Sequence, residues 1–300
     1  MIPGMFFIVG VLLGSFINAL VWRLHEQGKR RSWSLDLRSK KGNAQSSSSV
    51  KSPSSKLQAP SSSKDLSILK GRSMCPQCHH VLAPRDLIPI FSWLTLRGRC
   101  RYCAKAISVQ YPLIELLTGF LFTLLYSVWP MSFSGVHLVH FTYGLVYVVF
   151  FVALALYDMK WFLLPNKLVY PLTAVAASEV LVVALWSHTL VALWNPSAGA
   201  VLVFGLFWVL YQVSKGRWIG GGDVKLAIAL GLIAGTPLRA LLVVFFASLV
   251  GTVISLPLIV KGKNGMTQQV PFGPYLLAGC MIVLLFGARI VEWYQRILLQ

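Results

Sequence analysis

Charged residues are scarce in this chain, at 12% of 300 positions, whereas hydrophobic residues make up 56%. A soluble globular domain carries about a quarter charged residues, so the composition excludes that class. The chain also lacks a basic segment before its first apolar run, which is therefore expected to be a retained helix and not a cleaved signal peptide. Both deficits indicate a protein that spans a membrane.

Long apolar runs follow one another along the chain. They cover roughly residues 5–22, 111–129, 136–157, 168–187, 198–213, 223–236, 238–260 and 271–288. A helix needs about 20 residues to cross a bilayer, and most of these runs are long enough. We therefore expect an all-α polytopic membrane protein with about eight transmembrane helices, of which the sixth is short.

Acidic residues are few as well, nine against 27 Lys and Arg, which gives a net charge of +18. Such an excess is common in nucleic-acid-binding proteins, but 17 of the 27 basic residues lie between residues 23 and 110. If the chain crosses the membrane eight times, the short loops on the same side as the long loop bring the number of Lys and Arg there to 24, against three on the other side. Basic loops stay in the cytoplasm. We predict that the long loop is cytoplasmic, that both termini lie outside, and that the partner of this charge is the lipid bilayer and not nucleic acid.

The long loop has two unlike halves. Residues 32–70 contain 14 serines and seven Lys or Arg, a composition that cannot bury enough apolar surface to fold. The chain is thus divided into a first transmembrane helix (1–23), a basic Ser-rich disordered insert (24–71), a cytoplasmic domain (72–110) and a seven-helix membrane core (111–300). A linker without chemistry is the favoured role for the insert, with contact to anionic lipid as the alternative.

The chain has only five cysteines, and four of them form two pairs in that cytoplasmic domain, "CPQC" at 75–78 and "CRYC" at 100–103. Two Cys-x-x-Cys pairs are typical of a tetrahedral zinc site, and a cytoplasmic location disfavours disulfides. We predict that Cys75, Cys78, Cys100 and Cys103 bind a structural Zn²⁺ between helices 1 and 2. Reduced, metal-free pairs or a redox couple are the alternatives, and Cys280 is expected to be a packing residue.

Five acidic residues lie outside the long loop, and an ionisable group at membrane depth is a candidate for function. Glu292 is near an outer end and is expected to be solvated. Glu179 fits a buried packing role as well as a functional one. Glu115 could cap its helix or line a site. Asp158 and Asp223 stand apart because the topology brings both to the cytoplasmic ends of their helices.

The segment "IGGGDVKL" at 219–226 precedes the short sixth helix, which has about 14 residues before "GTP" at 235–237. That helix is too short to reach both interfaces, so its glycine loop should lie below the cytoplasmic surface. Gly220, Gly221 and Gly222 could admit a substrate backbone there. Two aspartates at one depth predict an aspartyl-protease dyad that shares a proton. From the helix dipoles, Asp223 is the expected base and Asp158 the expected acid.

These motifs resemble those of a known family. "GGGD" at 220–223 is similar to the Gly-x-Gly-Asp signature of intramembrane aspartyl proteases, and "DMKWFLLPN" from Asp158 resembles the first aspartate motif of bacterial type IV prepilin peptidases. Other similar segments are "GSFIN" at 14–18, "CPQC", "IPIFSWLTLRGRCRYC", "YPLIELLTG" and "VPFGPYL" at 270–276. The resemblance covers the chain apart from residues 32–70, an insert that is outside the usual pattern.

The resemblance implies an enzyme of the bacterial inner membrane with its active site facing the cytoplasm. Its catalytic residues would be Asp158 and Asp223, and its four paired cysteines would bind zinc. The expected substrates are type IV prepilins and type II secretion pseudopilins, cleaved after a glycine that ends a basic leader. The family commonly methylates the new N-terminal residue with S-adenosylmethionine, but no cofactor-binding residues can be identified in the sequence.

Three alternatives remain open. A presenilin-like protease would explain the glycine loop, although no Pro-Ala-Leu motif follows and the cysteines would be unexplained. An ion-coupled transporter could use the two aspartates as ligands, but its acids are expected at mid-membrane. A zinc-anchored scaffold without activity would leave the glycine loop without a role.

Overall fold

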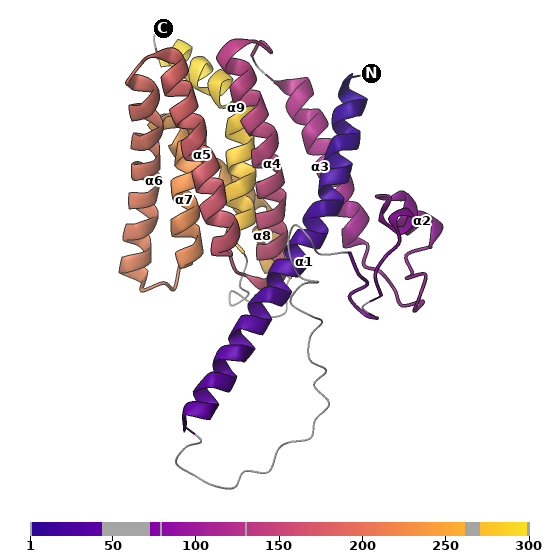
Figure 1. Cartoon of the computed structure of the whole chain (residues 1–300). Helices are drawn as coiled ribbons and strands as arrows, with labels where there is room; N and C mark the ends of the chain where they lie inside the picture. The colour runs from indigo at the N-terminus through magenta and orange to yellow at the C-terminus, as the bar shows by residue number, and fades with distance from the viewer. Residues whose placement is uncertain (1, 44–72, 79, 130, 262–270, 299–300) are drawn as a thin grey trace. The chain divides into compact units, whose positions relative to one another are not determined.

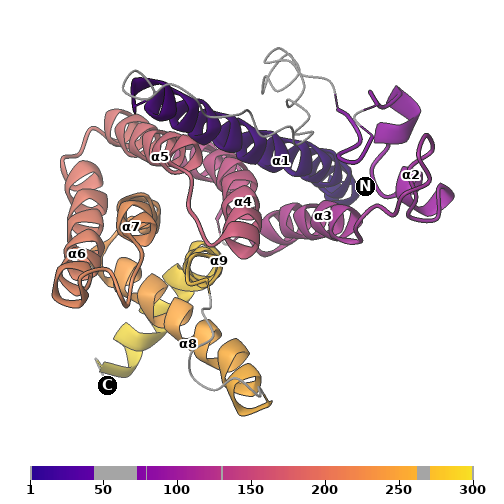
Figure 2. The same ribbon diagram turned by 90° about the horizontal axis from the view of Figure 1, so that it is seen from below.

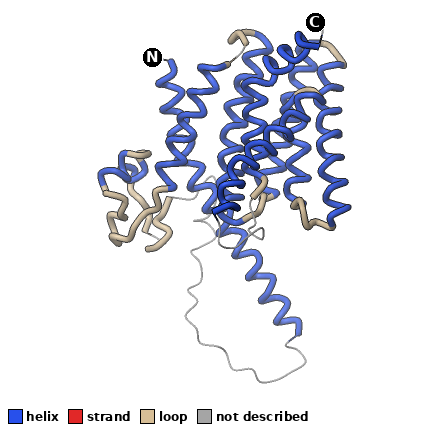
Figure 3. The backbone as a smooth tube through the Cα atoms, turned by 180° about the vertical axis from the view of Figure 1, so that it is seen from behind, coloured by secondary structure: helices blue, strands red, loops and turns tan. Residues whose placement is uncertain are grey.

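The computed structural model describes residues 2–43, 73–78, 80–129, 131–261 and 271–298 (Figure 1). Within these ranges the regular elements are all helices, as predicted, and β-structure is limited to two isolated bridges (Figure 3). The chain forms two compact units, one of Met1–Gly10 with Thr118–Gln300 and one of Val11–Leu117.

Among the residues that the structure describes, eight long helices form the membrane part. They are α1 (Ile2–Asn43), α3 (Gln110–Val128), α4 (Gly135–Trp161), α5 (Asn166–Ser187), α6 (Val191–Ser214), α7 (Gly221–Ala234), α8 (Pro237–Lys261) and α9 (Gly273–Leu298). Over the described residues, seven of them are long and apolar enough to cross a membrane, and α7, with 14 residues, is not among these. The expected number of helices and the shortness of the sixth are both confirmed.

The first helix is longer than its apolar run. Its candidate membrane span lies within Ile2–Arg30, but the helical backbone continues to Asn43. The predicted break after residue 23 is therefore absent, and the part of the predicted disordered insert up to residue 43 is helical. No proline interrupts residues 23–43, so the ladder of backbone hydrogen bonds can continue. The remainder of the predicted insert, residues 44–71, lies outside the described residues.

In the larger unit, α7 is an interior helix. It packs against α5, α6, α8 and α9, and Figure 2 shows it end-on between α6 and α9. Half of its residues are buried. The closest approach is to α6, where a Cβ on Gly231 would overlap the backbone of Ala200. Small residues at such crossings let membrane helices pack closely by van der Waals contact, so α7 is held in place without spanning the bilayer.

The smaller unit joins the later part of α1 to the start of α3 through the cysteine segment. That segment contains the short helices η2 (Pro84–Leu87) and α2 (Phe91–Thr95). The Asn18 amide of α1 donates a hydrogen bond to the Tyr111 carbonyl of α3 at 3.1 Å. The Trp93 indole donates to the Ile107 carbonyl at 3.1 Å. These bonds connect segments that are far apart in sequence and hold the four cysteines on one scaffold.

Candidate active site

Asp158 lies in the last turn of α4. The helix ends at Phe162, a left-handed residue (φ 53°) whose N–H donates to the Asp158 carbonyl at 2.8 Å. The Asp158 side chain is directed into the bundle, and the residue is only 5% exposed. Its carboxylate accepts a hydrogen bond from the backbone N–H of Gly273, the first residue of α9. The chain thus places a carboxylate at the amino end of a second helix.

Asp223 lies in the first turn of α7 and is part of a reciprocal cap. Its backbone N–H donates to the carbonyl of Gly220, the N-cap residue, at 3.1 Å. Its carboxylate in turn accepts the N–H of Gly220. An acidic residue three positions after the N-cap accepts the N-cap N–H in the same way in capping boxes, whose other half needs an N-cap side chain that Gly220 lacks. The cap fixes the Asp223 side chain over the glycine loop.

The two aspartates come together at one end of the bundle, where α4 ends and α7 begins (Figure 1). Asp158 is close enough to Asp223 to act on it as a charged neighbour. Both carboxylates accept a backbone N–H at a helix amino end, where the helix dipole favours an anion. At Asp158 the amino end of α9 offsets the unfavourable carboxyl end of α4, so the dipoles separate the two aspartates less than α4 alone would. The assignment of Asp223 as the base and Asp158 as the acid stays a prediction.

The glycines of the loop differ in the space around them. A Cβ on Gly220 would lie 3.3 Å from the Asp223 carboxylate, and one on Gly222 would lie 3.0 Å from Leu164. On Gly221, the nearest atom outside its neighbours would be 3.8 Å away, in the Tyr211 ring. Tight packing thus explains the first and third glycines of "GGGD", whereas the second has ordinary room.

Gly273 belongs to the site although sequence reasoning did not identify it as a site residue. A Cβ at this position would lie 2.5 Å from the Asp158 carboxylate and 3.4 Å from Leu164. The available signal was its place in "VPFGPYL", one of the segments that carried the family resemblance. Leu164 contacts both this glycine and Gly222, so the α4–α5 connection packs against the start of α7 and of α9.

Asn166 and Lys225 connect the same region from outside. The Lys225 ammonium donates to the Asn166 side-chain carbonyl at 3.2 Å and lies 5.9 Å from the centre of the Tyr170 ring. Asn166 begins α5 and Lys225 is in the first half of α7. This exposed contact positions α7 against α5.

The four paired cysteines form a second cluster, in the smaller unit. The sulfur atoms of Cys75, Cys78, Cys100 and Cys103 all lie within 4.8 Å of one another, and the Cys75 and Cys103 sulfurs are 4.0 Å apart. Zn–S bonds of about 2.3 Å in a tetrahedron place sulfurs about 3.8 Å apart. The cluster has the composition and compactness of a metal site. Cys280 is buried elsewhere, in α9.

The two cysteine turns repeat one backbone pattern. The first cysteine of each pair donates its N–H to the carbonyl five residues later, Cys75 to His80 at 3.0 Å and Cys100 to Lys105 at 2.9 Å. An isolated antiparallel bridge closes each turn, between Met74 and Val81 and between Arg99 and Ala106. The repeat directs both pairs of sulfurs to the same point from two sides.

Hydrogen bonding prepares this cluster for a cation. Burial opposes ionisation of Cys100, but hydrogen bonds from the backbone N–H groups of Tyr102 and Cys103 and from the thiols of Cys103 and Cys75 together lower its pKa to about 7. Asp86 receives bonds from Arg101 at 2.8 Å and Tyr102 at 3.1 Å. Although burial raises its pKa, these bonds lower it below its ordinary value. Asp86 therefore anchors the second cysteine turn to η2.

The remaining acidic candidates have separate partners. Glu115 is buried and accepts the Ile90 N–H at 2.7 Å, so it caps α2 and not its own helix. Glu179 accepts bonds from His140, at 2.7 Å, and from Tyr147. Glu292 is exposed near the end of α9. None of these three glutamates is among the contacts described above for Asp158 and Asp223.

Two sequence profiles match the chain. Residues 8–129 match the bacterial peptidase A24 N-terminal domain, and residues 145–256 match the type IV leader peptidase family. A prepilin leader peptidase/N-methyltransferase of Aeromonas salmonicida is 31% identical over 98% of this chain and 94% of its own length. The chain belongs to the type IV leader peptidase family.

Other relatives are similar over comparable lengths. The proteins with the same description from Aeromonas hydrophila and Pseudomonas aeruginosa are 32% and 30% identical, each over 96% of this chain and 92% of its own length. No solved structure gives a significant match. The chain is thus an integral-membrane peptidase of this family, and its two matched regions contain the cysteine cluster and the two aspartates respectively.

Proposed function

We propose that the protein is an aspartic endopeptidase that removes the basic leader from type IV prepilins and type II secretion pseudopilins, cutting after a glycine. The observation that carries the proposal is the convergence of Asp158 and Asp223 from two helix ends, each with a backbone N–H on its carboxylate. Family membership and the description of its relatives supply the substrate class.

Asp158 and Asp223 together have the groups that peptide hydrolysis requires. Two adjacent carboxylates share one proton, because two like charges at that distance disfavour each other. The ionised carboxylate takes a proton from water while the protonated one hydrogen-bonds the scissile carbonyl. The water oxygen then bonds to the carbonyl carbon. As the C–N bond breaks, the proton taken from water passes to the leaving nitrogen.

The orientation follows from charge. The basic residues counted over the long loop and the short loops on its side support a cytoplasmic location of the aspartates, with both termini outside the inner membrane. A prepilin with its leader in the cytoplasm and its apolar segment in the bilayer would present the cleavage site at this level.

We further propose that the enzyme methylates the new N-terminal residue, since its relatives are described as N-methyltransferases. When bound, S-adenosylmethionine supplies a methyl group from a positively charged sulfonium. The smaller unit has residues that fit such a cation, because the buried Glu115 carboxylate and an unpaired acceptor of Asn18 line one cavity. Both groups are remote in sequence from the two aspartates.

The metal proposed for the cysteine cluster is Zn²⁺. Four thiolates fill a tetrahedral zinc ion and leave no position for water, so the ion would be structural and would take no part in hydrolysis. Its role would be to hold the two cysteine turns together.

Co-expression with a prepilin tests the peptidase. Leader removal, followed by gel shift, is expected to be lost in Asp158→Asn and in Asp223→Asn and retained in Glu292→Gln, which removes an exposed carboxylate of the same helical bundle. Full processing by either aspartate variant would exclude the dyad. A transporter or a scaffold predicts no processing even by the unmodified protein.

A further inference from the structure

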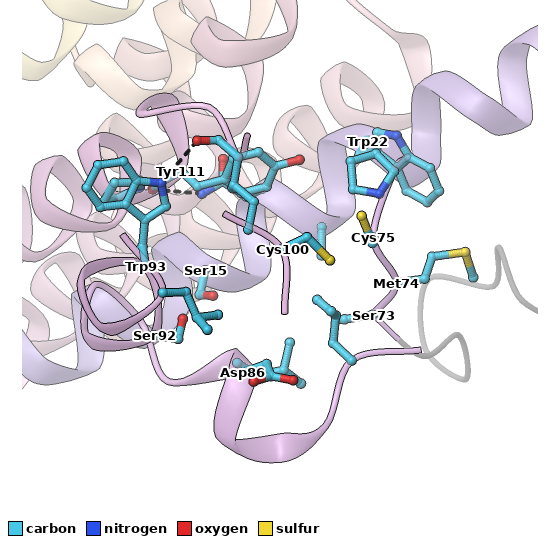
Figure 4. Close-up of a pocket in the computed structure, with 18 of the residues that line it drawn as sticks. Ser15, Trp22, Ser73, Met74, Cys75, Asp86, Ser92, Trp93, Cys100 and Tyr111 are labelled. Carbon is cyan, nitrogen blue, oxygen red and sulfur yellow. Dashed lines mark hydrogen bonds between the residues drawn. The ribbon is translucent and has the colours of Figure 1, made fainter. Parts of the chain in front are cut away.

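A cavity of about 150 Å³ lies within the Val11–Leu117 unit (Figure 4). Its walls come from α1, the two cysteine turns, η2, α2 and the start of α3. Neither proposed catalytic aspartate lines it, so peptide hydrolysis gives it no role. A cavity in the folded protein that the main reaction leaves unused is a candidate for a second ligand.

One wall of the cavity carries a hydrogen-bond acceptor without a partner. Asn18 is only 5% exposed, and its amide nitrogen donates to the carbonyls of Gly14 at 3.3 Å and Tyr111 at 3.1 Å. The nitrogen is therefore identified by its two acceptors, and the buried Oδ1 atom has no partner. Buried acceptors are nearly always satisfied, so this oxygen indicates a ligand that donates a hydrogen bond.

A buried carboxylate lines the same cavity. Glu115 is 6% exposed, and its oxygens accept bonds from the Ile90 N–H at 2.7 Å and from the Ser15 hydroxyl. Ile90 has φ 61° and ψ −53°, a costly conformation for a β-branched residue. Strain of this kind is retained where the surroundings hold a functional group in place. Glu115 is thus fixed in position as a recognition element for positive charge.

Aromatic rings and one guanidinium complete the lining. In Figure 4, Trp93 and Tyr111 lie on one side of the cavity, and Trp22 lies on the other side beside Cys75. Indole and phenol faces stack on flat heterocycles and attract cations. Arg23 also lines the cavity and can attract a carboxylate. The cavity therefore combines flat apolar faces with charges of both signs.

We propose that this cavity is the binding site for S-adenosylmethionine, an inference that rests on the proposed methyl transfer. Its positive groups match Glu115 and Asn18 Oδ1, its carboxylate matches Arg23, and its adenine matches the aromatic faces. A peptide amine alone would use the carboxylate and leave the rings and the guanidinium unexplained. The cysteine turns form part of the wall, which explains why a cluster with no role in hydrolysis belongs to the same chain.

Binding measurements on the purified, zinc-loaded full chain test the assignment without relying on catalysis. Titration calorimetry compares S-adenosylmethionine with S-adenosylhomocysteine, which lacks the sulfonium charge. Glu115→Gln is expected to weaken S-adenosylmethionine binding at least about tenfold and to remove the preference for the charged ligand. Trp22→Ala is expected to weaken both ligands alike.

The matched control is Glu179→Gln, which neutralises the other buried glutamate and lies in the other compact unit. It should bind both ligands as the unmodified protein does. Zinc content of each variant reports folding of the unit that contains the cavity, because the four paired cysteines belong to it. Leader cleavage reports folding of the unit that contains the two aspartates. Ultraviolet cross-linking of radiolabelled S-adenosylmethionine to the unmodified protein, followed by peptide mapping, should label peptides containing Trp22, Trp93 or Tyr111. This measurement tests the site even if a variant fails to fold.

Each contrary result has a distinct meaning. Label confined to residues 118–300, or unchanged affinity in both Glu115→Gln and Trp22→Ala, overturns the cavity assignment while methyl transfer stands. An unmodified protein that cleaves prepilin but neither binds nor uses S-adenosylmethionine overturns the methyltransferase proposal together with this site. The cavity could instead bind the free amino terminus of processed prepilin. In that case a short peptide with a free amino terminus binds there and S-adenosylmethionine does not, and this result also overturns the cavity assignment.

Discussion

At the residue scale, backbone N–H groups supplied by glycine define the environment of both aspartates. Gly273 donates to Asp158 and Gly220 donates to Asp223. Neither glycine has a positive φ, so conformational freedom does not explain them. Each instead lets the backbone approach a carboxylate more closely than a side chain would permit. A site of this kind is sensitive to a single methyl group.

Gly273→Ala should therefore inactivate the peptidase without unfolding it. The added Cβ would lie 2.5 Å from the Asp158 carboxylate and would force that side chain to move. A displacement of about 1 Å in a reacting group can reduce the rate about 100-fold. Initial rates of leader removal, measured beside thermal unfolding in detergent, check this. Gly205→Ala is the control, because nothing lies within 4 Å of its Cβ; equal rates in the two variants would contradict the prediction.

At the scale of elements, the short helix α7 depends on its neighbours. At about 1.5 Å per residue its 14 residues rise about 21 Å, less than the thickness of a bilayer core. Its first turn, with Asp223, can therefore lie below the surface while its buried face is held by α5, α6, α8 and α9. The level of the aspartate is set by packing and not by the length of the helix.

Gly231→Ala should separate α6 from α7, since the new Cβ would overlap the Ala200 backbone. Overpacking of this kind costs about 1–3 kcal/mol. We expect a lower unfolding temperature and slower leader removal, because Asp223 is in the displaced helix. Gly205→Ala in α6 should leave both unchanged or raise stability slightly through helix propensity. Thermal unfolding in one detergent distinguishes the two, and an unaltered Gly231→Ala protein would show that α7 tolerates displacement.

The cysteine turns give a second prediction at this scale. Cys75→Ser or Cys103→Ser should lower the metal content from about one zinc per chain, the value expected for one four-thiolate site, to nearly none. Cys280→Ser should keep the metal, because this buried cysteine is outside the cluster. Atomic emission on purified protein measures it. Leader removal should persist if zinc is structural, whereas its loss in step with the metal would indicate a catalytic ion.

At the scale of the whole molecule, the two proposed reactions use different parts of the chain. The aspartates belong to the unit of Met1–Gly10 with Thr118–Gln300, and the cysteine cluster and its cavity belong to Val11–Leu117. The two matched family regions, residues 8–129 and 145–256, likewise separate the cysteine cluster from the aspartates, although the first region extends beyond Leu117. Variants that affect one reaction and spare the other are therefore expected.

Orientation in the membrane can be tested at opposite ends of two consecutive helices. Ser187, at the end of α5, and Lys215, directly after α6, are both exposed. In intact cells, a membrane-impermeant maleimide should label Ser187→Cys and not Lys215→Cys. Both should react after the cells are opened. The unmodified chain is the control, since its paired cysteines would be cytoplasmic; labelling of Lys215→Cys in intact cells would reverse the topology.

Local pattern was sufficient for much of this protein. The helices follow from runs of apolar residues, because each run must satisfy its backbone groups within itself in a bilayer. The 14-residue length of α7 and the two cysteine turns were also predictable, because both depend on residues close together in sequence. The end of α1 was not predicted, since composition favoured disorder where the backbone remains helical to Asn43.

Only the tertiary structure decided the contacts between segments that are distant in the sequence. The sequence by itself determined the membrane class, the helix order, the cysteine pairs and the two aspartates as candidates. Packing decided that Gly273 donates to Asp158, that Glu115 holds Ile90, and that Asn18 leaves an unpaired oxygen in a cavity. Such contacts depend on the angles at which helices cross and on the space that side chains leave, and no local pattern of residues specifies either.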